Sequence, residues 1–308
     1  MRKVLAVTGP TASGKSSVAV AVAEKINGEI ISADSRQIYR HIPIAASYPS
    51  EEELNSVKHY FIGELELEEE FNAADFGRKA RETAEIIFNK GKQPVIAGGS
   101  GLYLRSFTDG LFEDETESGE VRKMLYEKLK NHGEEFLYSE LEKIDRPSAL
   151  KIPKGKIRRV IRALEVYYST GKKISDLHNE KPEIKFETVQ FGLLLDRKYL
   201  YKRINDRTDE MLRKGLIDEV RILKEKGYDY RSCNSLNTVG VKEVFRFLEG
   251  EYDYETMTGY IKQNSRRYAK RQMTWFRKDK RIIWINADEE STPEKTADEI
   301  IKNFKQIN

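Results

Sequence analysis

The stretch GPTASGKS, Gly9–Ser16, lies between a short apolar run and a segment of helical periodicity. It satisfies the phosphate-loop pattern, in which a glycine-rich turn joins a strand to a helix. In such a loop the backbone N–H groups and the helix N-terminus point at an anion, Lys15 adds a positive charge, and the Ser16 hydroxyl can ligate Mg²⁺. The stretch therefore predicts phosphate binding within an α/β fold. By itself it fits ATP hydrolysis or phosphoryl transfer as well as other chemistries.

Apolar runs and helical segments alternate outward from this loop. Strands are predicted for KVLAV (3–7), EIISAD (29–34), QPVIAGG (93–99), QFGLLLD (190–196) and RIIWI (281–285). Helical periodicity is found at 16–26, 73–89, about 198–226, 241–248, 254–276 and in a C-terminal segment. This alternation predicts an α/β fold with a parallel sheet flanked by helices on both faces.

One segment interrupts the alternation. Residues from about 117 to 185 show helical periodicity only, between two polar stretches, FEDETESGE (112–120) and HNEKPEIKFET (178–188), that resemble linkers. We therefore predict an inserted all-helical domain at 117–185 within a catalytic core made of 1–116 and 186–308.

Composition limits the class of protein. The chain has 308 residues, a net charge of +3 and 34% charged residues, and no apolar run approaches the roughly 20 residues of a membrane helix. Cys233 is the only cysteine, which excludes an intrachain disulfide and fits a reducing compartment. The four histidines lack zinc-type spacing. We expect a cytoplasmic monomer that does not contact a membrane.

Candidate site residues lie at the ends of three of the predicted strands. Asp34 ends the second strand, where a carboxylate can hold a metal or accept a proton, although an Asp there can also simply cap the following helix. Asp196 also ends a strand and could hold Mg²⁺ in a kinase. Arg36 and Gln37 add donors suited to the edge of a base. After the third strand, GGSGLY (98–103) allows close backbone approach and offers the Ser100 hydroxyl, or is only a tight turn.

Two segments gather cations. In KGKIRRVIRALEVYYSTGKK (154–173), Arg158, Arg159 and Arg162 fall opposite an apolar stripe, which is formed by Ile157, Val160, Ile161, Leu164 and Tyr168. In 260–281, nine cations are interleaved with aromatic residues, and Ile261, Tyr268 and Trp275 repeat every seven residues as a predicted inward stripe. Basic helices with aromatic residues suit an RNA with unpaired bases.

Several motifs together resemble one family. GPTASGKS, DSRQIY, GGSGLY, RRVIRALEVYYSTGK, KYLYKRINDRTDEML, GVKEV and YAKRQMTWFRKD occur in this order over about residues 4–285. This ordered set is similar to the bacterial tRNA dimethylallyltransferases, also called tRNA isopentenyltransferases. The resemblance implies a nucleotide-kinase-like fold with a helical insertion that grips the anticodon stem-loop of tRNA. It also implies transfer of a dimethylallyl group from dimethylallyl diphosphate to N6 of an adenosine next to the anticodon, usually position 37, with Mg²⁺ required and diphosphate released.

The resemblance also assigns roles to residues. It implies that the diphosphate is held by Gly9, Pro10, Thr11, Ala12, Ser13, Gly14, Lys15 and Ser16, with Ser16 on the metal. The catalytic residues would be Asp34 as general base, Lys15 and Thr11. The tRNA would be bound by Asp34, Ser35, Arg36, Gln37, Ser100, Arg122, Arg158, Arg159, Val160, Ile161 and Arg162. The chain departs from the family's usual pattern at Ala45–Pro49, Lys58–Gly63 and Pro153–Lys156.

Three other functions fit parts of the sequence. An adenylate isopentenyltransferase would prenylate free AMP, ADP or ATP with the same core, but it leaves the basic C-terminal helix without a purpose. A nucleotide kinase would move phosphate rather than a prenyl group. A phosphate-loop RNA-binding protein would lack catalysis, which Asp34 beside an intact loop argues against.

Overall fold

The computed structural model describes residues 1–111, 119–177 and 182–307. Its centre is a six-stranded sheet of order β3-β2-β4-β1-β5-β6, in which all neighbouring strands are parallel. The strands are β1 (Arg2–Thr8), β2 (Gly28–Ser32), β3 (His59–Tyr60), β4 (Gln93–Gly98), β5 (Phe186–Leu195) and β6 (Ile283–Ala287). The predicted parallel sheet is confirmed. The sequence does not predict β3, because two residues carry no apolar run.

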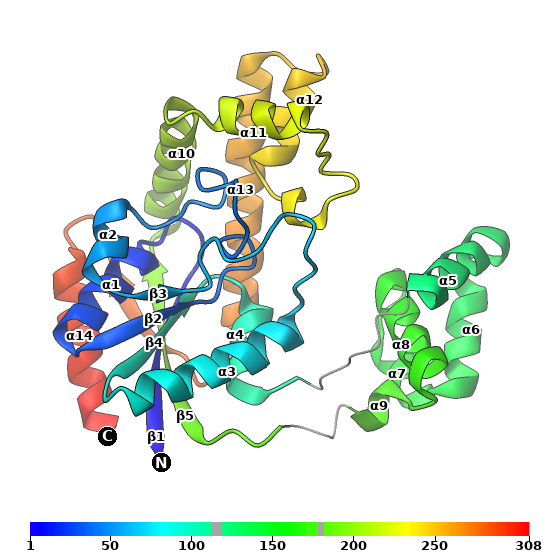
Figure 1. Ribbon diagram of the computed structural model, residues 1–308, viewed down its shortest axis with the longest axis horizontal. Helices are drawn as coiled ribbons and strands as arrows, with labels where there is room; N and C mark the ends of the chain where they lie inside the picture. Colours follow the sequence, from blue (N-terminus) through cyan, green and yellow to red (C-terminus); the bar gives the residue numbers. More distant parts are fainter. Residues whose placement is uncertain (112–118, 178–181, 308) are drawn as a thin grey trace.

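Helices cover both faces of the sheet (Figure 1). On one face lie α1 (Lys15–Lys25) and α14 (Pro293–Ile307), and on the other α3 (Ala73–Asn89) and α4 (Gly101–Asp109). Successive residues of β1 enter opposite cores: Val4 and Ala6 pack in the cluster with α3 and α4, and Leu5 and Val7 pack with α1 and α14. A strand buried on both faces is apolar at every position, which is why KVLAV is a continuous apolar run.

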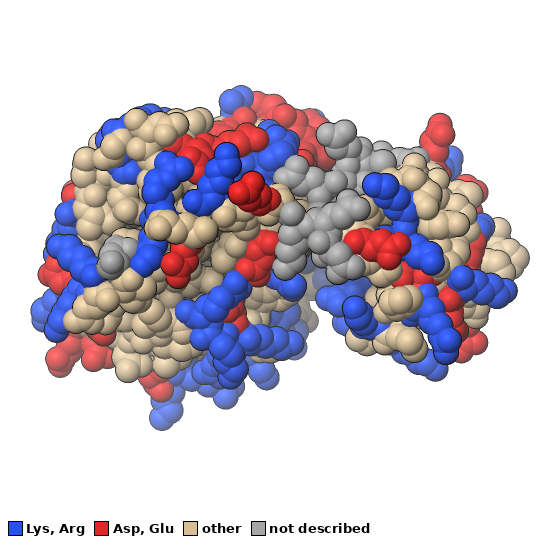
Figure 2. All heavy atoms as spheres, turned by 90° about the horizontal axis from the view of Figure 1, so that it is seen from below, with Lys and Arg blue, Asp and Glu red and all other residues tan. Residues whose placement is uncertain are grey.

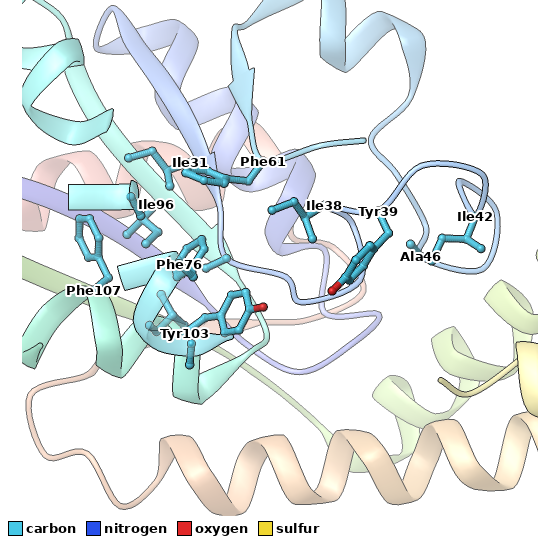
Figure 3. Close-up of a cluster of buried hydrophobic side chains, with 14 of the residues drawn as sticks. Ile31, Ile38, Tyr39, Ile42, Ala46, Phe61, Phe76, Ile96, Tyr103 and Phe107 are labelled. Carbon is cyan, nitrogen blue, oxygen red and sulfur yellow. The ribbon is translucent and has the colours of Figure 1, made fainter. Parts of the chain in front are cut away.

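The core on the α3 side contains most of the large aromatic side chains (Figure 3). Ile31 of β2 and Ile96 of β4 meet Phe76 of α3 and Tyr103 of α4, and the rings of Phe76 and Tyr103 stack with their centroids 4.4 Å apart. This packing joins α4 to the sheet. It therefore fixes the β4–α4 loop, which lies beside Asp34.

A group of helices stands beyond the carboxyl-terminal edge of the sheet (Figure 1). It consists of α10 (Arg197–Arg213), α11 (Leu216–Glu225), α12 (Val241–Leu248) and α13 (Tyr254–Phe276). The region predicted as helical at 198–226 is divided at Gly215, whose φ of +96° is readily adopted only by glycine. The short elements α2 (Glu51–Ser56) and η1 (Asn234–Leu236) lie in the connections.

The remaining helices form a separate lobe between α4 and β5 (Figure 1). They are α5 (Gly119–His132), α6 (Glu134–Ile144), α7 (Arg146–Lys151), α8 (Ile157–Thr170) and α9 (Ile174–Leu177). The lobe has its own apolar core, with Leu125, Leu141 and Leu164 fully buried. Tyr168 does not join that core as the stripe predicts, because it is 39% exposed and its hydroxyl bonds to Glu140.

The predicted linkers are shorter than the sequence suggests. Gly119 and Glu120 already belong to α5, and Phe186 to Thr188 already belong to β5. Residues 112–118 and 178–181 lie outside the described residues, and so does the predicted domain limit between 116 and 117.

Across the described ranges, each helix is too short or too polar to span a lipid bilayer.

Candidate active site

Two joined cavities lie where the strands of the sheet end. The first, the phosphate-loop cavity, has a volume of about 200 Å³ and is lined by Gly14, Lys15 and Ser16 among others. The second, the adjoining cavity, has a volume of about 290 Å³ and is lined by Asn237, Thr238 and Lys242 among others. Both are lined by Thr11, Ala12, Asp34, Ala46, Ser47, Arg207 and Tyr268. These shared residues show that the cavities lie side by side, with Asp34 lining both.

The phosphate loop is held in shape by bonds to its own backbone and to α13. Ser13 N–H donates to Pro10 O over 3.2 Å, and Thr11 N–H donates to the Gln272 side chain over 2.8 Å. Gly14 has a φ of +87° and precedes α1, so the N–H groups that begin the helix face the phosphate-loop cavity. Gly9 must be small, because a Cβ there would lie 2.8 Å from Ser13 Oγ.

Only part of the predicted diphosphate set reaches the cavity. Thr11, Ala12, Gly14, Lys15 and Ser16 line it. Gly9, Pro10 and Ser13 are buried beneath the loop, and the Ser13 side chain is only 4% exposed. These three therefore support the loop rather than face a ligand, which corrects the sequence-based list for them.

Three cations surround the phosphate-loop cavity. Lys15, Arg203 and Arg207 line it, and Arg207 is fixed by bonds from Nη1 to Thr11 Oγ1 at 2.9 Å and from Nε to Ser47 Oγ at 3.1 Å. Burial lowers the pKa of Lys15 from 10.5 to about 8, although the nearby Asp34 carboxylate opposes that shift. Burial also lowers the pKa of Arg207. The cavity therefore concentrates positive charge in a desolvated place, which suits a polyanion.

Asp34 has two structural roles at once. Its Oδ1 accepts a hydrogen bond of 2.9 Å from Arg36 N–H, so it caps the turn that follows β2 rather than the helix that the simpler interpretation expected. Its side chain also lines both cavities. Tyr268 lines the same two cavities, and burial together with the charge of Asp34 raises the pKa of Tyr268 to about 12. A neutral phenol and a carboxylate thus lie at the junction.

The β4–α4 loop supports Asp34 from behind. Ser100 Oγ accepts from Ser35 N–H over 3.1 Å, and Ser100 N–H donates to Ala33 O over 3.2 Å. A Cβ at Gly98 would lie 2.1 Å from Ala33 O, so glycine is required for this approach. The GGSG stretch is both a tight turn and a close contact with the residues on either side of Asp34.

Arg36 and Gln37 are engaged within the protein. The Arg36 guanidinium donates to the carbonyl oxygens of Asn234, Ser235 and Asn237 at 2.8 to 3.4 Å. Gln37 accepts from Ser32 Oγ and donates to Ser47 O, each over 2.8 Å. Both side chains therefore hold the loops that wall the cavities. Arg36 also lines the adjoining cavity and Gln37 the phosphate-loop cavity, so their contact with a base edge stays a prediction, although the donors named above are already bonded within the protein.

The predicted tRNA-binding residues of the helical lobe differ in exposure and in bonding. Arg122 and Arg162 both bind the buried Glu165 carboxylate, at 3.0 and 2.9 Å, while Arg158 and Arg159 are exposed. Val160 and Ile161 are 0% and 3% exposed in the core of the lobe. Their side chains cannot contact tRNA, and this corrects the sequence-based list for these two.

The lobe is separate from the joined cavities. All residues that line the two cavities come from the core, so within the described residues Arg122 and Arg158–Arg162 are not brought to Asp34. Figure 2 shows Lys and Arg side chains gathered along the same side of the larger body and of the lobe, at the lower edge of that view.

The sequence misses Arg203, Arg207 and Gln272. The two arginines lie four residues apart, hence on one helix face, which is the signal that could have found them. Gln272 belongs to the true buried stripe of α13, which is Met257, Ile261, Ala269, Gln272 and Phe276. The stripe predicted through Trp275 is wrong, because Trp275 is 40% exposed. The signal that could have identified Gln272 is a single amide side chain among residues that recur at helical spacing and are otherwise apolar.

Metal ligands are few at this edge. Asp34 supplies the carboxylate in the lining of the phosphate-loop cavity, and Ser16 supplies the hydroxyl at the start of α1, while the hydroxyls of Thr11 and Ser47 already accept bonds from Arg207. In the parts of the chain that the structure describes, His, Cys, Asp and Glu side chains form no group of three or more that could hold a metal ion. A cation here would need oxygens from a ligand or from water.

The parallel sheet, the helical lobe and the paired cavities together define an α/β protein with a candidate ligand site at its strand ends. A family model described as IPP transferase matches residues 37–279. A tRNA dimethylallyltransferase of Acetivibrio thermocellus is 45% identical over 99% of this chain and 97% of its own. The chain belongs to the IPP transferase family.

Solved structures agree with this assignment. The tRNA isopentenylpyrophosphate transferase of Bacillus halodurans has a TM-score of 0.74 and 34% identity, covering 100% of this chain and 97% of its own. A eukaryotic dimethylallyltransferase described as acting on tRNA has a TM-score of 0.82 and 29% identity, covering 100% of this chain and 80% of its own.

Proposed function

We propose that the protein transfers a dimethylallyl group from dimethylallyl diphosphate to N6 of an adenosine in tRNA and releases diphosphate. The observation that carries this proposal is that the phosphate-loop cavity and a second cavity adjoin at Asp34, which lines both. A donor diphosphate and an acceptor base can therefore enter from different sides and meet at one carboxylate. The names of the relatives support the same reaction.

The phosphate-loop cavity, where the donor would bind, stabilises the leaving diphosphate. As the bond between carbon and oxygen breaks, the electron pair moves to the diphosphate and negative charge builds there. The N–H groups at the start of α1, with Lys15, Arg203 and Arg207, lie around the cavity where that charge develops. Fixed positive groups in a desolvated site lower the barrier because they need no reorganisation during the reaction.

Mg²⁺ fits this end, with few protein ligands. The ion usually keeps several waters and is held by substrate phosphates and one or two protein oxygens, of which Ser16 Oγ would be one here. When bound, it would neutralise part of the diphosphate charge.

Asp34 serves the acceptor end as the general base. The N6 lone pair is delocalised into the purine ring, so the amine is a weak nucleophile until a proton leaves. As the bond from N6 to carbon forms, the nitrogen becomes acidic and passes one proton to Asp34. This requires only hydrogen-bond reach, and Asp34 faces the adjoining cavity.

The RNA is gripped outside the cavities. The exposed Arg158 and Arg159 of the helical lobe bind backbone phosphates of the anticodon stem-loop, and the adenosine next to the anticodon, at position 37, turns out of its stack into the adjoining cavity. Leaving the stack costs a few kcal/mol, which phosphate contacts offset.

The deciding experiment incubates the protein with unmodified tRNA, dimethylallyl diphosphate and Mg²⁺, followed by mass spectrometry of the nucleosides. We expect a five-carbon adduct on adenosine that maps to the anticodon loop. Parallel reactions with free AMP, and with ATP and a nucleoside, test the prenylation of free nucleotides and phosphoryl transfer. An adduct on AMP alone, or none at all, would contradict the proposal.

A further inference from the structure

Gln272 joins the two loops that form the site. Its side chain is 6% exposed on the inner face of α13. Oε1 accepts from Thr11 N–H over 2.8 Å, and Nε2 donates to Gly99 O over 2.9 Å. A backbone N–H can only donate and a carbonyl can only accept, so this orientation of the amide is the one that satisfies both partners. One planar group thus spans the phosphate loop and the β4–α4 loop.

Both partners lie directly next to reacting groups. Thr11 precedes Ala12, a non-glycine residue with a φ of +63°, and both line the junction of the cavities. Gly99 precedes Ser100, whose Oγ holds Ser35 N–H beside Asp34. The chain of contacts therefore runs from the loop that faces the donor, through Gln272, to the residue adjacent to the proposed base.

The surroundings keep this amide in place. Ala269 packs with Leu200 and Ile204 of α10, and Phe276 is buried in the core on the α3 side, so α13 is anchored on both sides of Gln272. Gly99 leaves room for it, because a Cβ at that position would lie 2.4 Å from Gln272 Nε2. A buried amide with both ends bonded costs little to bury and resists displacement.

We propose that Gln272 is a positioning residue that sets the separation between the phosphate loop and Asp34. This inference rests on the proposed function, because it concerns the alignment of a donor carbon with an acceptor amine. Gln272 borders the phosphate-loop cavity, but Oε1 and Nε2 each bond to one of the two loops, so we assign the amide to holding these loops rather than to binding a reactant. Its loss should therefore spare the binding of each substrate and impair the transfer between them.

The test compares Gln272→Met, which keeps the length of the side chain, with Thr274→Val, an exposed residue whose Oγ1 bonds only to Lys270 O of its own helix. In Gln272→Met we expect kcat for prenyl transfer to fall about 10- to 100-fold, the scale of a misplacement of about 1 Å. KM for the donor and Kd for tRNA should stay within about threefold. Diphosphate release should exceed prenyl transfer, because water competes for a misaligned donor.

Gly99→Ala should displace the Gln272 side chain as well, because the added Cβ would lie 2.4 Å from Gln272 Nε2. We expect it to reproduce the effect of Gln272→Met, and the double variant to be no slower than the slower single variant. Independent, additive losses would overturn the proposal. So would an unchanged kcat in a Gln272→Met protein that shows faster amide hydrogen exchange in peptides containing Thr11.

The hydrogen-exchange measurement needs no substrate. It therefore detects loss of the two hydrogen bonds of Gln272 even if Gln272→Met is poorly stable and only Gly99→Ala can be assayed for activity. Unchanged exchange around Thr11 in both variants would also overturn the proposal. A wild-type protein that forms no prenylated adenosine contradicts the proposed function instead. The two failures are therefore distinguishable.

Discussion

Arg207 of α10 and Thr11 of the phosphate loop are joined by a hydrogen bond of 2.9 Å, although 196 residues separate them in the chain. The same guanidinium reaches Ser47 Oγ through Nε at 3.1 Å. Arg207 therefore connects three segments at the junction of the cavities, where a leaving diphosphate and the transferred group would lie. A residue that both shapes a site and carries its charge should be sensitive even to conservative replacement.

Arg207→Lys should lower kcat/KM for the donor by about 10²- to 10³-fold, because one ammonium cannot make the forked contacts of a guanidinium. Steady-state kinetics at saturating tRNA measures this effect. Arg213→Ala, at the exposed end of the same helix, is the control and should change little. Equal kinetics in the two variants would exclude Arg207 from the donor site.

Asp34→Asn separates the two roles of Asp34. Asn keeps an oxygen that can accept from Arg36 N–H, so the turn and the melting temperature should be retained, but it cannot take a proton at neutral pH. We expect turnover to fall by about 10² to 10⁴ while tRNA binding persists. A variant with near-normal turnover would show that Asp34 only caps the turn.

The sheet is predictable because its central strands are buried on both faces and read as apolar runs. KVLAV and EIISAD need no tertiary information to be recognised, and the helix at 73–89 carries its own capping box at Asn72. The two residues of β3 and the change of helix at Gly215 depend on neighbours in space. Local pattern therefore yields the architecture but not every boundary.

The site residues likewise fall into those that a local sequence motif identifies and those that depend on contacts between distant segments. The phosphate loop and Asp34 are local motifs at strand ends, so sequence finds them. The partners of Arg36 cannot be found, because the carbonyl of Asn234 lies 198 residues further along the chain. Val160 is buried against α5 and α6. The amphipathic pattern predicts that this face of the helix is buried, but not which helices cover it.

The lowered pKa of Lys15 predicts that binding of the donor depends on pH. Its pKa in the free protein is about 8 because it is buried, so the charged fraction falls as pH rises through 8. A bound diphosphate favours the ammonium and must raise that pKa. We expect uptake of a proton on binding near pH 8 to 9, detected by calorimetry in two buffers with different heats of ionisation. In Lys15→Arg, whose guanidinium stays charged, proton uptake should disappear.

Val160→Ala tests the burial of this residue in the lobe. The side chain is fully buried, so truncation should destabilise the lobe by about 1 to 2 kcal/mol, because apolar area is no longer buried and a cavity is left behind. Chemical denaturation measures this cost. The affinity of the folded protein for tRNA should not change, and a large loss of affinity without loss of stability would restore Val160 as a contact.

Arg158 and Arg159 should bind phosphates, because both are exposed on α8 while Arg122 and Arg162 are bound to Glu165. Replacing both Arg158 and Arg159 with Ala should weaken tRNA binding and reduce the slope of log K against log salt by about one for each phosphate that is no longer neutralised. Turnover at saturating tRNA should be retained, since neither residue lines the cavities. The control replaces the exposed Lys130 and Lys143 of the same lobe with Ala, which removes the same charge from other helices. If the two double variants show the same slope, the lobe attracts RNA only through its overall charge, and α8 is not where the phosphates bind.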